Sequence, residues 1–332
     1  MHLTNPLRLI LPLLPLIPPT TPLNIACISE WIEHTPLFHT AQHLYAGPDV
    51  ANLSRGGVVN LIDGTSPSVD LGANAETQGL KQYVQHRNIR LIGIIVEVPY
   101  RLVANTAKAN ITALTDLRGK RIGTIPSTSA EVFIRQLLAT VGLQAGTDYQ
   151  IVSGNVCMRE PCAADTLPEQ LRAGQIDAFG IWETSVELGV RALGGLTEDG
   201  GTGTAVTFQD LEVYREVYSL YSTAEKLADP QTRKRIVAFV KGLAQAYEVF
   251  KAEGDDILGE VAQRVGVDGD VLKAVWGDHL WGPGDLGDRL LEFLDREDEY
   301  LAGVDKRQRL TKEELKTFVD ASVYAEAAAG SK

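Results

Sequence analysis

Apolar residues in the first two thirds of the chain form short runs that alternate with segments of helical periodicity. The short runs predict strands, and the periodic segments between them predict helices. The predicted strands are 23–28, 69–73, 91–96, 100–104, 121–125 and 178–181, and the predicted helices are 35–45, 77–85 and 129–141. This alternation predicts an α/β fold with mixed, mostly parallel sheets and helices on both faces.

From residue 229 onward the pattern predicts long helices instead. Asp229 is placed to cap a helix with Pro230 in its first turn, and apolar residues recur at helical spacing over 236–250. Further helices are predicted at 257–265, 271–276, 288–301 and from 311. Thr311 and Glu314 have the spacing of a capping box, which defines where the last of these helices begins.

Composition narrows the class of protein. A chain of 332 residues is long enough for about two domains. Its 44% hydrophobic and 22% charged residues fit neither a disordered chain nor a polytopic membrane protein. The formal net charge of −12 disfavours nucleic acid as a partner, because such binding depends on Lys and Arg neutralising phosphates. We therefore expect a soluble, acidic, two-domain globular protein, and separately we expect it to be a monomer.

The first residues resemble an export signal. Arg8 is followed by an apolar stretch over 9–17, which has the length of a signal-peptide core and is too short to span a bilayer. Prolines interrupt this stretch, so a disordered apolar tail is the alternative. We predict a signal peptide over 1–22 and a secreted protein, periplasmic if the source is bacterial, without a stable membrane anchor.

Two kinds of modification are predicted for a secreted chain. Asn52 and Asn110 each begin an Asn-x-Ser/Thr tripeptide and are predicted glycosylation sites in a eukaryotic secretory pathway. Cys157 and Cys162 lie in a predicted loop, where an oxidising compartment favours a disulfide between them. Cys27 lies in an apolar strand and is predicted to be a buried thiol.

Polar and aromatic residues follow several predicted strands at their carboxyl ends, where open parallel sheets bind ligands. The candidate ligand-binding residues are Glu30, Trp31, Asn74, Glu76, Thr77, Ser127, Thr128, Ser129, Trp182 and Glu183, with Tyr100 and Asn155 as weaker candidates. The turn over 127–129 precedes a predicted helix, whose free N–H groups could hold an anion or a ligand oxygen. Helix capping is its alternative role, with Thr128 and Glu131 forming a capping box.

The aromatic and acidic candidates suggest a ligand class. Trp31 and Trp182 could sandwich a flat or apolar molecule, with ordinary core packing as the alternative. Glu30, Glu76 and Glu183 would select a cationic or amino-bearing ligand, because a buried carboxylate needs a donor or a cation. Salt bridges to arginines of the chain are the alternative for these glutamates.

Catalytic and metal-binding motifs are weak. His39 and His43 are four residues apart on a predicted helix, as metal-binding pairs are, but no motif ties a carboxylate or cysteine to them. We therefore predict no metal site. His34 could act with Glu30 or Glu33 as a general base, yet the chain contains no nucleophile motif and no P-loop. We predict no catalytic residue and no cofactor.

Three segments carry a resemblance to a known family. Residues 114–123 read LTDLRGKRIG and precede a Ser/Thr-rich turn and a helix ending at 143; residues 171–178 read LRAGQIDA; residues 30–42 have a Thr-Pro-Leu core. These segments resemble the "DLxGKxIG" strand, the "LxAGxIDA" turn and the first ligand loop of the SsuA/THI5/NMT1-like substrate-binding proteins. The resemblance covers essentially the whole chain after the leader.

The resemblance implies a type II periplasmic-binding fold, in which two α/β lobes enclose a ligand. Crossovers near 103–106 and 212–215 would assign 23–104 and 214–332 to lobe 1, and 105–213 to lobe 2. The implied function is a solute-binding protein for a small polar, amino-bearing or heterocyclic molecule. An ABC importer would be the partner of a bacterial member, whereas the two glycosylation tripeptides favour a secreted fungal member.

An enzyme on the same fold is the alternative function. The THI5 branch of the family makes a pyrimidine precursor and carries a clustered-cysteine iron motif. This chain has only Cys157 and Cys162 in a comparable region, which favours the binding protein.

Overall fold

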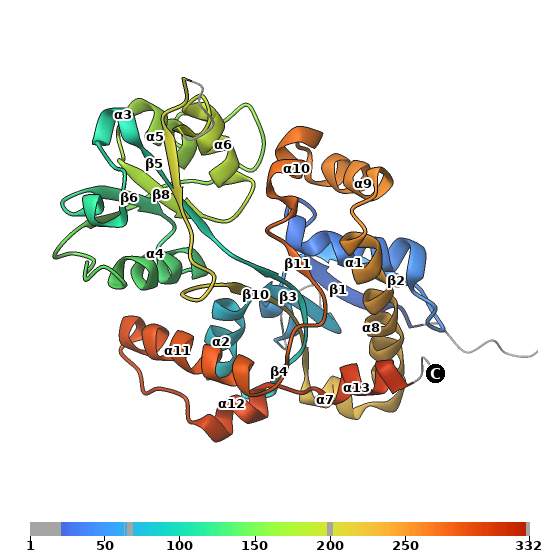
Figure 1. Ribbon diagram of the computed structural model, residues 1–332. Coiled ribbons are helices and arrows are strands. Elements are labelled where there is room, and N and C mark those ends of the chain that lie inside the picture. Colours follow the sequence, from blue (N-terminus) through green and yellow to red (C-terminus); the bar gives the residue numbers. More distant parts are fainter. Residues whose placement is uncertain (1–20, 63, 65–68, 198–201, 330–332) are drawn as a thin grey trace, which may run out of the picture.

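The computed structural model describes residues 21–62, 64, 69–197 and 202–329 (Figure 1). The predicted signal peptide over 1–22 lies outside these residues except for its last two positions. None of the helices in the described ranges is long and apolar enough to cross a membrane.

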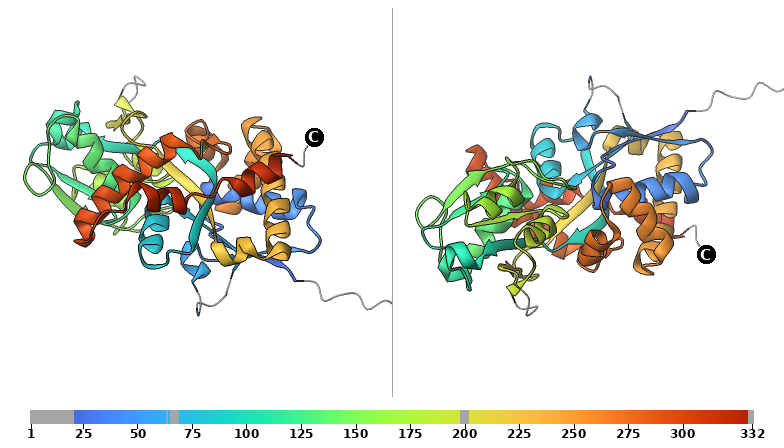
Figure 2. Two further views of the ribbon diagram at one scale, coloured as in Figure 1. Left: turned by 90° about the horizontal axis from the view of Figure 1, so that it is seen from below. Right: turned by 90° about the horizontal axis from the view of Figure 1, so that it is seen from above.

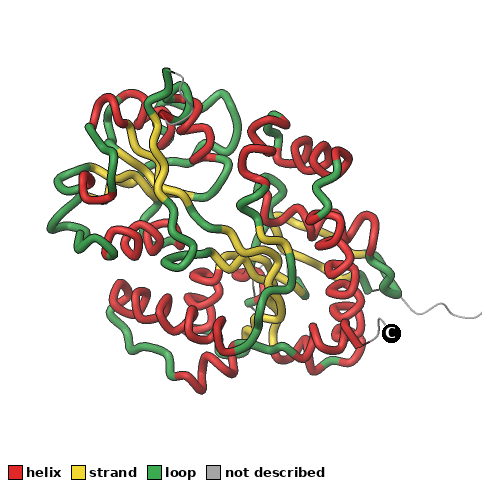
Figure 3. The backbone as a smooth tube through the Cα atoms, in the orientation of Figure 1, coloured by secondary structure: helices red, strands yellow, loops and turns green. Residues whose placement is uncertain are grey.

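The described strands form two sheets, which appear as separate groups surrounded by helices in Figure 3. In spatial order, the first sheet contains β11 (Leu280–Trp281), β4 (Ile89–Val98), β10 (Glu216–Thr223), β3 (Leu71–Ala75), β1 (Leu23–Cys27) and β2 (Ala51–Arg55). The second sheet contains β7 (Gln150–Ser153), β6 (Arg121–Thr124), β8 (Ala178–Ile181), β5 (Arg101–Asn105) and β9 (Ala205–Phe208). β10 and β5 run antiparallel to both of their neighbours, so both sheets are mixed. The predicted α/β fold with mixed sheets is confirmed. The expectation of mostly parallel sheets is wrong, because five of the nine strand pairings among the described residues are antiparallel.

Helices cover the sheets. They are α1 (Thr35–His39), α2 (Glu76–Gln85), α3 (Thr106–Ala109), α4 (Ser129–Ala139), α5 (Leu167–Ala173), α6 (Ser185–Ala192), α7 (Ala224–Ala228), α8 (Pro230–Lys251), α9 (Asp255–Val265), α10 (Gly269–Trp276), α11 (Asp288–Asp305), α12 (Lys312–Phe318) and α13 (Ser322–Ala329). A 3₁₀ turn, η1 (Ile32–His34), precedes α1, and a π-helical turn, η2 (Thr40–Leu44), continues it.

Each sheet has its own apolar core. One cluster packs α8 against the first sheet through residues such as Phe239 and Phe250, and another packs α2, α11 and α12 through residues such as Tyr83 and Phe318. A separate cluster around Phe179 fills the second sheet. The views from below and from above in Figure 2 place the elements of the second sheet together at one end of the molecule.

Two of the helix caps predicted from the sequence are present in the structure. Asp229 Oδ1 accepts the Thr232 N–H at 2.7 Å at the start of α8. Thr311 and Glu314 form the predicted capping box of α12, with N–H···O distances of 2.7 Å and 3.2 Å. These caps fix the helix starts because each needs only residues within one turn.

The chain passes between the sheets twice, after β4 and after β9. We predicted that 101–104 would belong to lobe 1, but Arg101 to Ala104 pair with Ile181 to Ala178 in the second sheet. The first crossing therefore lies at Pro99, one strand earlier than predicted. The strand itself could be predicted locally, but its sheet depends on which distant strand it pairs with. The division into two lobes remains our proposal.

Candidate functional site

A cavity of about 320 Å³ lies between elements of the first sheet and elements of the second. This volume is at the lower end of the range for small-molecule sites. The loop after β1, the start of α2 and strand β10 form one side, and the start of α4 with the turn after β8 forms the other. The cavity is therefore where the two halves of the fold meet.

Half of the sequence candidates line this cavity. They are Trp31, Asn74, Thr77, Thr128, Ser129 and Trp182. They lie at the carboxyl ends of β1, β3 and β8 and at the N-terminus of α4, the region where α/β sheets place ligands. Asn74 also fixes the facing loop, because its Oδ1 accepts the Val58 N–H at 2.7 Å.

The two tryptophans do not form the expected sandwich. The ring centroids of Trp31 and Trp182 are 5.8 Å apart and the ring planes make an angle of 52°. A flat ligand between two parallel rings needs a spacing of about 7 Å, twice the van der Waals contact distance. The two rings contact each other instead, so they form one aromatic wall built from both halves of the fold.

The three glutamates proposed as ligand partners do not line the cavity, because each already has a partner in the protein. Glu30 pairs with Arg55 at the surface at 2.6 Å. Glu183 is buried and accepts a hydrogen bond from Arg101 Nε at 2.8 Å. The third, Glu76, is fully buried at the start of α2.

Glu76 holds the start of β10 in place. Its carboxyl accepts the Val217 N–H at 2.9 Å and the Tyr214 O–H at 3.1 Å. Burial raises the pKa of Glu76 to about 7, and these hydrogen bonds oppose the shift. The role of Glu76 in this structure is to join α2 to β10.

The turn before α4 differs from its predicted form. The Ser127 N–H donates to Glu131 Oε2 at 2.7 Å, and Thr128 Oγ1 donates to the Ile125 carbonyl at 2.8 Å. The predicted capping box between Thr128 and Glu131 is therefore not formed. Lys81 Nζ on α2 donates to the Ser127 carbonyl at 2.5 Å, which ties the two sides of the cavity together.

The weaker candidates lie outside the cavity wall. Asn155 donates to Asp165 at 2.7 Å. Tyr100 is buried behind the wall, where its O–H donates to Glu216 Oε1 and its oxygen lies 3.2 Å from Ser129 Oγ. Tyr100 thus holds Glu216, a lining residue that the strand-end analysis missed.

Glu33 and Glu216 are the carboxyl groups that line the cavity. Both residues are 2% exposed, so neither carboxyl is solvated as it would be at the surface. Burial raises the pKa of Glu33 to about 7, and the charge of Glu183 adds to this shift. Burial also raises the pKa of Glu216 well above its usual value, with the charges of Glu33 and Glu76 acting in the same direction. Burial and these neighbouring charges therefore favour the protonated form of Glu216 when no cation offsets its charge.

The sequence contains a pattern that could have predicted the strand on which Glu216 lies. Residues 216–223 read EVYSLYST, an eight-residue run rich in aromatic and β-branched residues, which is typical of a strand. The run forms β10, and every residue of it is buried. Glu33 carries no such signal, because the turn η1 that buries it depends on contacts with the rest of the fold.

Several lining residues carry buried polar atoms that have no partner among the described residues. They are Thr77 Oγ1, Trp182 Nε1, Glu216 Oε2 and the Tyr218 hydroxyl. A buried polar atom left unsatisfied costs about 1–3 kcal/mol. Such atoms around one cavity favour an occupant with both hydrogen-bond donors and acceptors.

His34 is not suited to general-base chemistry. It is fully buried, and burial lowers its pKa to about 3, with the hydrogen bond to Ile28 opposing the shift. Its ring packs against Tyr218 with centroids 4.9 Å apart. A general base at neutral pH needs a pKa near 7, so His34 serves as a neutral packing residue beside the cavity.

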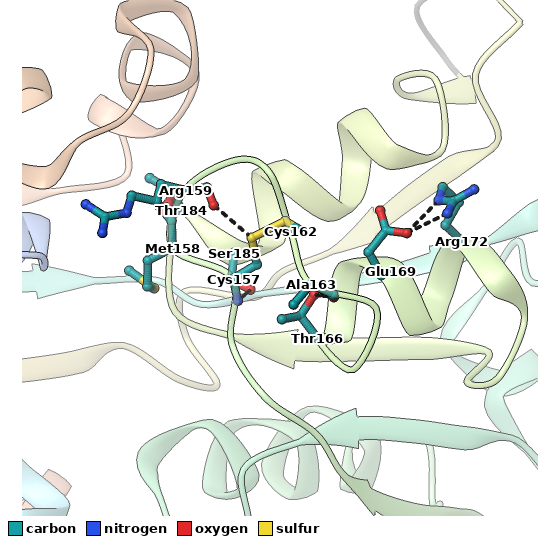
Figure 4. The surroundings of a disulfide bond; sticks show 10 residues. All are labelled: Cys157, Met158, Arg159, Cys162, Ala163, Thr166, Glu169, Arg172, Thr184 and Ser185. Carbon is teal, nitrogen blue, oxygen red and sulfur yellow. Dashed lines mark hydrogen bonds and ion pairs between the residues drawn. A yellow bond between two sulfur atoms is a disulfide. The ribbon is translucent and has the colours of Figure 1, made fainter.

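The cysteines and the glycosylation tripeptides are not among the residues that line the cavity. Cys157 and Cys162 form a disulfide (Figure 4). Cys27 is free and buried, and burial raises the pKa of its thiol to about 12. Asn52 and Asn110 are exposed, and their glycosylation remains a prediction.

Comparisons with known proteins agree with this architecture. A family model described as NMT1/THI5 like matches residues 59–256. No curated protein matches the chain. The periplasmic aliphatic sulphonate binding protein SsuA from Escherichia coli is similar in structure, with 13% identity and a TM-score of 0.66 over 90% of this chain and 92% of that chain.

Two further structures extend the range of functions on this fold. The Candida albicans CA3427 gene product, described as having the generic periplasmic binding protein fold, is 15% identical, with a TM-score of 0.60 over 91% of this chain and 96% of that chain. The desulfurization enzyme DSZB is 16% identical, with a TM-score of 0.57 over 94% of this chain and 100% of that chain. At these identities the likeness shows the fold alone, which serves both binding proteins and an enzyme.

Proposed function

Since the chain belongs to the NMT1/THI5-like family, we propose that it is a secreted solute-binding protein that holds a small amino-bearing or heterocyclic ligand between its two lobes. The observation that carries the proposal is the pair of buried carboxyls, Glu33 and Glu216, on the wall of a cavity of about 320 Å³. Trp31, Trp182 and Tyr218 supply aromatic surface beside them.

The charge of the cavity favours a cation. Among the described residues, those that line the cavity include no Lys or Arg, whereas Glu33 and Glu216 do line it. A sulfonate or nitrate would meet two acidic groups there without a cationic partner. An ammonium or amidinium group would instead stabilise the ionised carboxylates, and aromatic rings add about 0.5–2 kcal/mol of cation–π attraction. Because burial raises the pKa of Glu33 to about 7, a bound cation that favours its ionised form should release a proton near neutral pH.

Matched probes of opposite charge test the ligand class. Native mass spectrometry of gently purified protein is the first step, since it detects a molecule that co-purifies. Calorimetry with benzylamine and benzenesulfonate then compares two ligands that share a flat ring and differ in charge. We expect benzylamine to bind with proton release, and benzenesulfonate to bind at least tenfold more weakly.

The variant Glu216→Gln tests whether the charge of Glu216, rather than the packing of its side chain, contributes to ligand affinity. Loss of one charge-assisted hydrogen bond costs about 1.5–3 kcal/mol, so we expect benzylamine affinity to fall roughly ten- to a hundredfold. Glu248→Gln, a change of the same kind at an exposed position, should leave the affinity unchanged. Tight benzenesulfonate binding that survives Glu216→Gln would contradict the acidic-cavity proposal and favour the turn before α4 as the anchor.

The cellular setting is part of the same proposal. The predicted signal peptide, the disulfide and the two exposed glycosylation tripeptides all suit a secreted protein. An ABC importer is the expected partner if the source is bacterial, and a monomer is the expected assembly.

An enzyme remains the second candidate because DSZB shares the fold. The specific alternative is synthesis of a pyrimidine precursor, as in the THI5 branch. The low pKa of His34 and the raised pKa of Cys27 leave neither group ready for proton abstraction or nucleophilic attack. Incubation with iron and pyridoxal phosphate tests this alternative, because a change in protein mass or a pyrimidine product would end the binding-only proposal.

A further inference from the structure

Two histidines and a glutamate meet on the first half of the fold, outside the residues that line the cavity. His39 lies at the end of α1, His43 lies in η2, and Glu260 lies on α9. Glu260 Oε2 is 2.9 Å from His39 Nδ1 and 3.8 Å from His43 Nε2. One ligand atom from each of the three residues lies within 4.8 Å of the others.

The helices bring these residues together for identifiable reasons. Four-residue spacing places the two imidazoles on one side of α1 and η2, with ring centroids 4.8 Å apart. α9 runs beside this segment, as the orange and blue helices in Figure 1 show. Arg264, one turn after Glu260, donates to Gln42 Oε1 at 2.9 Å and lies over the Phe38 ring at 4.4 Å. These contacts hold α9 in the register that presents Glu260.

We propose that His39, His43 and Glu260 bind one divalent transition-metal ion of the Zn²⁺ class. Two imidazole nitrogens and one carboxylate oxygen are a common protein ligand set for Zn²⁺, which takes a fourth ligand such as water. The same set does not suit Mg²⁺ or Ca²⁺, which prefer oxygen ligands. The ion would link α1 and η2 to α9. Its binding does not depend on the proposed solute.

Two of the three separations between ligand atoms are close to those that tetrahedral coordination needs, and all three atoms lie within 4.8 Å of one another. Bonds of about 2.0–2.1 Å place neighbouring ligand atoms about 3.3 Å apart. The separation of 2.9 Å between His39 and Glu260 is slightly shorter than this value, and that of 3.8 Å between His43 and Glu260 is slightly longer. The side chain of His43 is 53% exposed, so it can move to bring its ring nitrogen toward the other two ligand atoms.

The residues around the proposed metal site determine how firmly its ligands are held and how an ion reaches it. The side chain of His39 is only 13% exposed and its ring packs against the edge of Phe250. One ligand is thus held in place by packing while His43 leaves a side open for ion entry and for a water ligand. The nearby Arg264 guanidinium opposes a cation, but it already donates a hydrogen bond to Gln42 and lies over the Phe38 ring.

An ordinary ion pair is the competing explanation for this cluster. A partly exposed His–carboxylate pair contributes at most about 1 kcal/mol and requires no metal. The two explanations differ in what Zn²⁺ does to the protein, because only a metal site produces stoichiometric, saturable binding that depends on all three residues.

The test is calorimetry with ZnCl₂ on the full chain, stripped with a chelator and free of any affinity tag. We expect one ion per chain, and at least a tenfold loss of affinity in each of His43→Ala and Glu260→Gln. Asp256→Asn, an exposed carboxylate on the same helix, and His86→Ala, a histidine at the end of α2, are the matched controls and should bind as the wild type does.

A second readout is the thermal unfolding temperature, which Zn²⁺ should raise in the wild type and in the controls but not in His43→Ala or Glu260→Gln. Circular dichroism checks that each variant is folded, and both altered positions are partly exposed, which limits the structural cost. Absence of one-to-one binding overturns the proposal. Binding that is unchanged in both site variants also overturns it, because it would locate the ion elsewhere.

Discussion

Replacing Glu33 by glutamine should change how the stability of this protein depends on pH. The pKa of Glu33 is about 7 in the folded protein and 4.5 ordinarily, chiefly because burial disfavours the charged form. Between these two pH values the folded state binds a proton that the unfolded state has released. The free energy of unfolding therefore falls as pH rises from about 4.5 to about 7.

The size of this effect follows from the two pKa values. Their difference of about 2.5 corresponds to roughly 3 kcal/mol of stability lost on ionisation of Glu33. Glutamine has nearly the shape of the protonated acid and does not ionise. Glu33→Gln should therefore match the wild type near pH 4.5 and exceed its free energy of unfolding by about 3 kcal/mol at pH 8.

Urea denaturation at several pH values between 4.5 and 8 measures this difference, with unchanged m-values showing that the same transition is compared. Glu248→Gln, whose side chain is 74% exposed, is the control and should follow the wild type throughout. Some dependence on pH should persist in Glu33→Gln because burial also raises the pKa of Glu76 to about 7. Parallel curves for the wild type and Glu33→Gln would refute the assignment of Glu33 as a buried, protonated acid.

Two further predictions concern groups outside the cavity lining. Thiol labelling without reductant should modify no cysteine in the folded protein and only Cys27 after denaturation; labelling of Cys157 and Cys162 would contradict the disulfide. Arg101→Gln should cost about 3–5 kcal/mol in the urea-derived free energy of unfolding, because it leaves the buried Glu183 without its cationic partner. Adding Glu183→Gln to that variant should restore part of the loss, and no restoration would show that the arginine stabilises the fold in another way.

Much of the fold was predictable because its signals are local. The strand predicted at 178–181 is β8, and the helix predicted at 129–141 is α4 with its end two residues earlier. The cap at Asp229 and the capping box at Thr311 both formed as expected. In each case the deciding interactions lie within a few residues, so the sequence pattern contains them.

The candidate site was predictable only in its location. The strand-end rule found Trp31, Thr77 and Trp182, because parallel strands bring their carboxyl ends to one edge of a sheet. It did not show which carboxyls face the cavity. Glu76 and Glu183 point to partners inside the protein, and those partners come from strands far along the chain.

The sequence by itself determined the α/β class, most helix and strand positions and the family, since periodicity, capping and short motifs are properties of neighbouring residues. Only the tertiary structure decided that β5 joins the second sheet, that Glu33 and Glu216 share a cavity and that Glu260 meets His39 from 221 residues away. The physical reason is that these arrangements depend on how separate elements pack. Packing brings together residues whose separation along the chain does not predict their distance in space.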